Sequence, residues 1–415
     1  SVLDRAGRMR EAPRPFSPEN AVQHYNEWIY AAIDLKADAA ASVPLRMYTR
    51  KLTRRELRQL GYRYGATFRM RKPTQRALKY LRGEYYAHRP SVGVSTKVAD
   101  MGDDLVEVVE SHPAMDLLAK ANPYMSGCDL TKLRHIYKCS TGNAYVLSVF
   151  AGQTPSQLWS LPSQWVWIVP SDETFIKGYV YGRSIRDAER VEFASDEVMQ
   201  FKRPNPKSLI YGMGDVEACW SAIGLHNAER ASQTATYEND GRPDYLLMVK
   251  SNARRDELDR FEQEVESQLR GPRNRGRWLT VGGDVDLKPL QWSPKDLGDP
   301  ESVVEEIAAV TKVPVSMLLS NDPNLASAEV GHAAFFRFAV HPLCLEDEGV
   351  LNDRYLPLWG LGDAAFVAYD DPVPENRAME VERVTRLATT GVATYNEARV
   401  MQGLDRRSDP NGGKL

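Results

Sequence analysis

The residues able to do acid–base, nucleophilic or metal chemistry are scattered along this chain. The seven histidines form no pair at metal-ligand spacing, and the patterns HExxH, GxSxG and GxxxxGK[ST] do not occur. The four cysteines form no CxxC pair, which predicts reduced, buried thiols rather than a disulfide framework: Cys128, Cys139, Cys219 and Cys344. We therefore expect no catalytic residue, no metal site, no cofactor and no enzymatic activity.

Clusters of acidic residues are the main support for an alternative function, that of a metal-dependent enzyme. They are Asp103-Asp104, Asp370-Asp371 and Glu346-Asp347-Glu348. In principle such carboxylates could ligate Mg²⁺ in a nuclease or phosphotransferase, although carboxylates adjacent in sequence rarely reach one ion. This reading depends mainly on Asp370 and Asp371.

Two glycine-containing stretches bear on nucleotide binding. "YGMGDVE" at 211–217 carries two of the glycines of a GxGxxG loop, but no clear βαβ context precedes it. "VGGDVD" at 281–286 is typical of a hairpin turn rather than a phosphate loop. Neither stretch indicates a nucleotide site.

Composition is that of an ordinary globular protein, with one local exception. The 415 residues are 42% hydrophobic and 26% charged, with a net charge of −3. Residues 51–90, however, hold twelve Lys or Arg against two acids, with tyrosines interleaved. The segment is either a solvated excursion or an arm that contacts phosphate or an acidic protein, and a generic DNA-binding adaptor is a third reading of the chain. The candidate contacts are Arg54, Arg55, Arg58, Arg69, Arg71 and Lys72.

The first half of the chain is expected to combine helices with an antiparallel meander. An alanine-rich helix starts near Tyr25 and ends before Val43-Pro44, and a short strand follows. Two helices are predicted at 112–123 and 127–140. β-Branched and aromatic runs separated by turn residues then predict strands at 142–150, 164–170, 178–182 and 196–204.

The second half is expected to be mainly helical. A long helix over 211–241 leads to a strand–helix–strand unit at 244–292, and Asp299-Pro300 begins another helix. After a polar turn a helix continues from about 325 to Pro342, where a kink is expected. A strand at 364–372 and helices at 374–389 and 395–403 close the chain, which is α+β and predominantly helical. No apolar run approaches the roughly 20 residues that span a bilayer, so we expect no membrane contact.

The order of these segments resembles the portal proteins of tailed bacteriophages, closest to the long-tailed type. The resemblance rests on "SVPLRMY", on "HPAMDLLAKANPYMS" followed by "TGNAYVLSV", and on "DEVMQFKRPNP" leading to "YGMGDVEA". It continues through "RWLTVGGDVDLKPLQWSPKD", "EEIAAVTKVPVSMLL" and "TTGVATYNEARVMQGL". These segments cover roughly residues 20–405, and the basic stretch 51–90 departs from the family pattern.

The resemblance implies a portal fold of wing, stem, clip and crown that assembles as a cyclic ring, usually of twelve subunits. The implied divisions are an N-terminal arm (1–19), wing (20–210), stem helices (211–241 and 293–314), clip (242–292), tunnel loop (315–329), kinked tunnel helix with return to the wing (330–369), crown (370–405) and a disordered tail (406–415).

The implied function is the channel at one capsid vertex through which double-stranded DNA is packaged and ejected. The nearly uncharged loop would line the constriction with Leu318, Leu319, Ser320, Asn321, Asp322, Pro323, Asn324 and Leu325. Acids of the preceding helix would repel the DNA backbone: Glu301, Glu305 and Glu306. The clip would dock the packaging motor through Arg254, Arg255, Arg273, Arg275, Arg277 and Trp278.

The implied partners are further copies of the chain, DNA, the terminase large subunit, the major capsid and scaffolding proteins and a head–tail adaptor. The implied location is the portal vertex of the virion, after assembly in the host cytoplasm.

Overall fold

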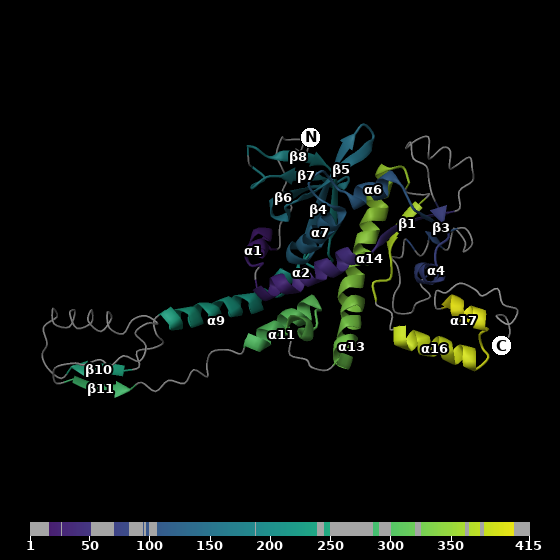
Figure 1. The fold of residues 1–415 in the computed structure, drawn as a ribbon. Helices are drawn as coiled ribbons and strands as arrows, with labels where there is room; N and C mark the ends of the chain where they lie inside the picture. Colours follow the sequence, from purple (N-terminus) through teal and green to yellow (C-terminus); the bar gives the residue numbers. More distant parts are fainter. Residues whose placement is uncertain are drawn as a thin grey trace. The chain divides into compact units, whose positions relative to one another are not determined.

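The structure is a computed structural model, and its elements are shown in Figure 1. It describes residues 16–25, 27–50, 70–82, 94, 97–98, 106–186, 188–238, 245–249, 285–289, 300–319, 325–361, 365–373 and 377–401. Two compact units are each built from separated stretches of chain. The first comprises Ser1–Asp38 and Leu117–Pro323, and the second comprises Ala39–Asp116 and Asn324–Leu415.

The β-structure of the first unit is antiparallel, as predicted from the β-branched and aromatic runs. Its described strands at 143–202 form two sheets, however, rather than one meander, and the strands at 154–161 and 191–194 were not predicted. Among the described strands, one sheet has the order β5-β4-β9 and a second has the order β6-β7-β8. Their bounds are β4 Asn143–Ala151, β5 Thr154–Leu161, β6 Val166–Ser171, β7 Phe175–Tyr181, β8 Val191–Ala194 and β9 Val198–Lys202. A shared apolar cluster that includes Tyr145, Ile168 and Tyr179 joins the two sheets.

The first unit contains several helices. They are α1 Pro18–Gln23, α2 Glu27–Ser42 (whose last residues enter the second unit), α7 Gly127–Thr141, α8 Asp215–Ala218, α9 Trp220–Glu238, α11 Pro300–Thr311 and α12 Val315–Leu318. Of these, α7 packs against the β5-β4-β9 sheet. A capping box between Ser126 and Asp129 starts α7. The unit also contains a separate antiparallel pair, β10 Tyr245–Val249 and β11 Val285–Pro289.

The second unit is centred on an antiparallel sheet of described strands in the order β12-β1-β3-β2. The strands are β1 Leu45–Arg50, β2 Met70–Arg71, β3 Val106–Val109 and β12 Ala365–Tyr369. Its helices are α4 Gln75–Leu81, α6 Pro113–Ala119 (which ends in the first unit), α13 Leu325–Phe335, α14 His341–Val350, α15 Leu356–Leu358, α16 Arg377–Thr389 and α17 Tyr395–Met401. The predicted capping box of α17 is confirmed, since Thr394 and Glu397 bond to each other's backbone N–H groups.

Near Pro342, where a kink is expected from the sequence, the structure shows a change of helix type. The helix widens into a π-helical segment at Phe336–Val340 immediately before Pro342, and a second π-helical segment follows at Leu351–Tyr355. Proline lacks the N–H that an α-helix needs and clashes with the preceding turn. A π-helical widening accommodates that clash without ending the helix.

Side chains of this helical run cover the outer edge of β12. Asn352 donates from Nδ2 to Val367 O and accepts at Oδ1 from Val367 N–H, both at 2.8 Å. Glu348 Oε1 accepts from Tyr369 N–H at 2.9 Å. These groups take the hydrogen bonds that a further strand would make, so the backbone of β12 is satisfied on both sides.

A buried histidine at the start of α6 makes the stability of the second unit dependent on pH. His112 is fully buried, its Nδ1 accepts a hydrogen bond from Ala114 N–H, and its ring meets Trp359 edge-on. Burial lowers its pKa to about 4. Between about pH 6.5 and pH 4, His112 therefore stays unprotonated in the folded protein, whereas in the unfolded chain, with a histidine pKa of about 6.5, it binds a proton.

We predict that the free energy of unfolding is highest above about pH 6.5 and falls as the pH drops towards 4. His112 should account for a loss of up to about 3 kcal/mol. His112→Asn keeps an acceptor at the helix start without titrating, so its melting temperature should fall less over this range. The control His332→Asn changes an exposed histidine of α13 and should keep the wild-type slope. Equal slopes for all three proteins in thermal melts would contradict the assignment.

Candidate channel-forming site

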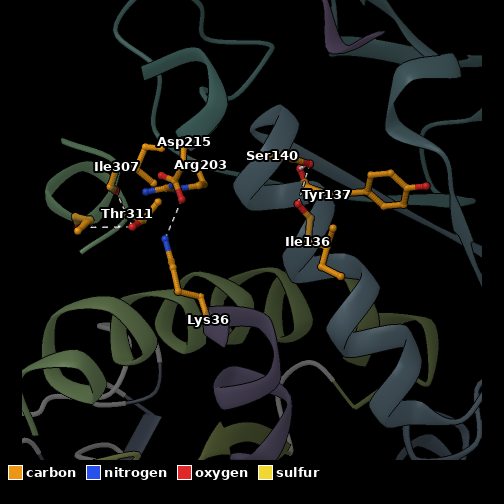
Figure 2. A network of polar contacts seen from close by, with 9 residues as sticks. Lys36, Ile136, Tyr137, Ser140, Arg203, Asp215, Ile307 and Thr311 are labelled. Atoms are coloured by element: carbon orange, nitrogen blue, oxygen red, sulfur yellow. Dashed lines mark hydrogen bonds and ion pairs between the residues drawn. The ribbon is translucent and has the colours of Figure 1, made fainter. Parts of the chain in front are cut away.

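A buried ion cluster fixes the point where the predicted stem begins. Lys36 of α2 approaches Asp215, the first residue of α8, with Nζ 2.7 Å from Oδ2, and the two side chains are 3% and 4% exposed. Arg203, which follows β9, donates to the other carboxylate oxygen of Asp215. Figure 2 shows the three side chains turned towards one another. The start of α8 and the nearby end of β9 are thereby joined, at one carboxylate, to α2, whose Lys36 lies 179 residues before Asp215.

The charges of this cluster compensate one another. Burial pushes the pKa of Asp215 upward, but the Lys36 ammonium and the Arg203 guanidinium outweigh burial and hold the pKa below its usual value. The pKa values of two nearby thiols are shifted upward instead. Burial raises the pKa of Cys139 and raises that of Cys219 to about 12. Both thiols are therefore protonated and unreactive at neutral pH.

All four cysteines are free, as predicted, but Cys128 is exposed rather than buried. It lies on the first turn of α7.

The glycines of "YGMGDVE" have a structural use. A Cβ on Gly212 would lie 2.0 Å from Gly142 O, and one on Gly214 would lie 2.2 Å from Ser140 O. Gly142 itself ends α7 with φ +81°. The glycines thus let the backbone cross the end of α7 at close range and bring Asp215 to Lys36, which explains them without a phosphate ligand.

The predicted outer stem helix is divided at its start. The expectation of one helix through 211–241 was wrong there, because α8 ends at Ala218, Cys219 leaves the helical region, and α9 runs from Trp220 to Glu238. At 1.5 Å per residue α9 is about 28 Å long rather than 40 Å. His226 Nε2 lies 2.9 Å from Glu27 Oε2, which links α9 to the first residue of α2.

The second stem helix, α11, lies beside α9 in the first unit (Figure 1). Its buried stripe is Val303, Val304, Ile307, Ala308 and Thr311. On the other face Glu305 and Glu306 are exposed, and the side chain of Glu301 lies outside the described residues. The observed bounds agree with the predicted start at Asp299-Pro300.

The chain turns sharply after α11. Lys312 adopts φ +60°, and Val313 N–H returns to Ala308 O. The short helix α12 follows, and Leu318 and Leu319 at its end are half-buried. Leu325 is the first residue of α13, whereas Ser320, Asn321, Asp322, Pro323 and Asn324 lie outside the described residues.

The other predicted contact residues are described only in part. Arg71 ends β2, Lys72 follows it, and both are exposed, whereas Arg54, Arg55, Arg58 and Arg69 lie outside the described residues. Within the predicted clip, 242–292, the structure describes β10 and β11. The predicted docking residues of the clip, Arg254, Arg255, Arg273, Arg275, Arg277 and Trp278, also lie outside.

Of the acids invoked for metal chemistry, Asp103 and Asp104 lie outside the described residues, and Glu348, Asp370 and Asp371 are engaged in structural contacts. Asp370 accepts from Arg46 Nε at 2.8 Å, and Asp371 pairs with Arg76 at 3.4 Å and accepts from Val373 N–H. Among the described residues no group of three or more His, Cys, Asp or Glu side chains is placed to hold a metal ion. No helix in the described part is long and apolar enough to cross a membrane.

Sequence reasoning missed the Lys36–Arg203–Asp215 cluster, although one signal was present. Ile29, Ala32, Ile33, Lys36 and Ala37 lie on one buried stripe of α2, so a lysine interrupts an apolar face. A buried lysine requires an anionic partner. The partner lies 179 residues away, and no local pattern identifies it.

Removing the carboxylate should leave the buried Lys36 ammonium without the anion that it contacts. We predict that Asp215→Asn lowers the free energy of unfolding by about 3–5 kcal/mol, measured by urea titration. Glu382→Gln breaks an exposed pair with Arg386 on α16 and should cost no more than about 0.5 kcal/mol. A similar small loss for both variants would show that the buried cluster does not hold the unit together.

Sequence comparison relates this chain to a protein family and to an individual protein. The family model for "Phage portal protein" matches residues 94–403. An uncharacterised protein of Rickettsia bellii (strain RML369-C) is 23% identical over 314 residues, covering 73% of this chain and 80% of its own length.

Solved structures support the same fold. A chain in the neck of an empty gene transfer agent (GTA) particle, computed with C6 symmetry, matches with a TM-score of 0.61 and 23% identity over 96% of both chains. A chain in the native GTA neck, computed with C12 symmetry, matches with a TM-score of 0.61 and 21% identity over 96% of both.

A third structure comes from a named member of the family. The HK97-family phage portal protein of Corynebacterium diphtheriae matches with a TM-score of 0.50 and 14% identity, covering 85% of this chain and 94% of its own. The family model spans about three quarters of the sequence and the solved folds agree with it. The chain therefore belongs to the phage portal protein family.

Proposed function

We propose that about twelve copies of this chain form a ring at one vertex of a capsid, and that double-stranded DNA passes through its centre during packaging and ejection. The observation that carries the proposal is the family match, supported by the likeness to chains in particle necks computed with C6 and C12 symmetry. The role is structural, and the virion portal vertex is its site of action.

In this proposal α9 and α11 form the stem, β10 and β11 belong to the clip, and α13 to α15 form the tunnel helix. The helices α16 and α17 form the crown. The terminase large subunit docks at the clip, and the capsid, scaffolding and head–tail adaptor proteins bind other surfaces. Assembly takes place in the host cytoplasm.

The channel must let a polyanion slide. Duplex DNA carries one charge per roughly 1.7 Å, so a basic lining would hold it. The exposed face of α11 instead presents Glu305 and Glu306. The half-buried Leu318 and Leu319 lead into a loop whose sequence has Asp322 as its only charge, so this lining would repel the backbone or leave it unbound.

The clip strands need support from outside the pair. Leu247 of β10 faces Leu287 of β11 in a two-stranded ladder. Isolated two-stranded pairs are marginally stable in water and expose edges on both sides. Strand pairing with the next copy would satisfy one edge and would help to close the ring.

The ring itself is the first test. Purified protein imaged by electron microscopy should show rings with a central hole and, after class averaging, cyclic symmetry of about twelve. Mass photometry should detect the same oligomer. A stable monomer at high concentration would refute the proposal.

The electrostatic part is tested separately. The double variant Glu305→Lys/Glu306→Lys should form rings that retain duplex DNA at low salt and release it as salt is raised, whereas wild-type rings retain little. The control Glu382→Lys adds charge to an exposed position of α16 and should behave like wild type. Equal DNA retention by all three rings would remove α11 from the channel lining.

A further inference from the structure

Three turns of the first unit lie at one end of its sheets. In the antiparallel pairing of β4 with β9, Leu147 faces Val198, so the β4–β5 turn lies beside the β8–β9 turn. In the pairing of β7 with β8, Gly178 faces Ala194, so the β6–β7 turn lies beside the same β8–β9 turn. We call these three turns, with the residues that border them, the hairpin end.

The hairpin end exposes apolar side chains next to acids. Val149 is 39% exposed, Phe150 36% and Phe175 51%, although each borders a well-packed strand. Glu173 and Asp196 are exposed beside them, and neither carboxylate has a cationic partner among the described residues. A surface that is both apolar and acidic fits a protein partner with cations around an apolar contact.

Phe175 has a strained backbone conformation at the hairpin end. Its φ is +64°, a left-handed conformation that bulky residues rarely adopt. The turn is fixed by Ser171 Oγ, which accepts from the N–H groups of Glu173 and Thr174. Glycine or asparagine would meet this backbone requirement with less strain, so the aromatic ring has a use outside the fold of its own chain.

The second unit carries a complementary basic surface. Lys72 follows β2, and Lys79 lies in the last turn of α4, which Thr74 caps through Ala77 N–H. Both lysines are exposed and have no anionic partner among the described residues. Arg71 and Arg76 are by contrast directed towards Glu110 and Asp371 of their own unit. We call Lys72, Lys79 and the intervening residues the β2–α4 ridge.

A cyclic ring joins one patch of each copy to a different patch of the next. Resting on the ring proposed above, we propose that the hairpin end of one copy binds the β2–α4 ridge of its neighbour. Glu173 and Asp196 pair with Lys72 and Lys79, and Phe175 packs against the apolar stems of these lysines. This assigns residues 70–82, the described part of the basic segment, to contact with protein rather than with DNA.

The experiment exchanges charges between the two surfaces. Glu173→Lys/Asp196→Lys alone and Lys72→Glu/Lys79→Glu alone should each weaken assembly about tenfold, measured as the protein concentration at half-maximal ring formation. All four changes in one chain restore the pairing and should return that concentration towards wild type. Asp353→Lys, an exposed acid elsewhere, is the control and should leave assembly unchanged.

Cross-linking reads the contact without requiring a closed ring. In a Cys128→Ser background, tagged Glu173→Cys protein mixed with Lys72→Cys protein should form a disulfide between chains, and wild-type competitor should suppress it. If wild-type protein forms no rings but this cross-link appears, the ring proposal fails and the contact stands. If rings form and no cross-link between chains appears, the contact is overturned and the ring stands.

Two further results would also overturn the contact. One is a cross-link confined to a single chain that carries both cysteines. The other is loss of DNA retention by Lys72→Glu/Lys79→Glu with ring assembly unchanged, which would assign the ridge to DNA. Phe175→Asn gives an independent signature, because it should raise the melting temperature by relieving the backbone while weakening assembly.

Discussion

The first unit depends on one buried carboxylate. Asp215 joins α2, Arg203 after β9 and the start of α8. The site is buried, so replacing the carboxylate with water or with another charge would lower the free energy of unfolding. Because Gly212 and Gly214 allow the chain to cross α7 without a Cβ, the carboxylate arrives in one orientation. Because α9 begins at Trp220, shortly after Asp215, the cluster ties the start of the long helix to α2 and to the end of β9.

Much of the fold was predictable because its signals are local. The break at Val43-Pro44, the start of α11 at Pro300 and the Thr394–Glu397 cap all depend on residues within a few positions of one another. The strands β4, β6, β7 and β9 were predictable for the same reason. The break at Cys219 was missed, because an apolar stripe continues through it and the interruption arises from the tertiary contact at Asp215.

The site was less predictable than the fold, for a physical reason. The proposed function is that of a channel, which needs no reactive group that a motif could reveal and works through an absence of strong contacts with DNA. The residues that do make strong contacts, such as Lys36 with Asp215 or Asn352 with Val367, pair across long sequence separations. Such pairs are identified only once the fold is known. The resemblance to portal proteins, by contrast, rests on the order of many sequence segments, none of which is specific alone.

The chain treats its two kinds of sheet edge differently. Asn352 and Glu348 close β12 with hydrogen bonds from a helix, whereas β10 and β11 form a pair with no such cover among the described residues. In the proposed ring, many copies meet at a high local concentration, where open strand edges pair indiscriminately. Side chains that close the outer edge of β12 prevent strand pairing there. They thereby limit where copies can join and suppress misassembly before any partner binds.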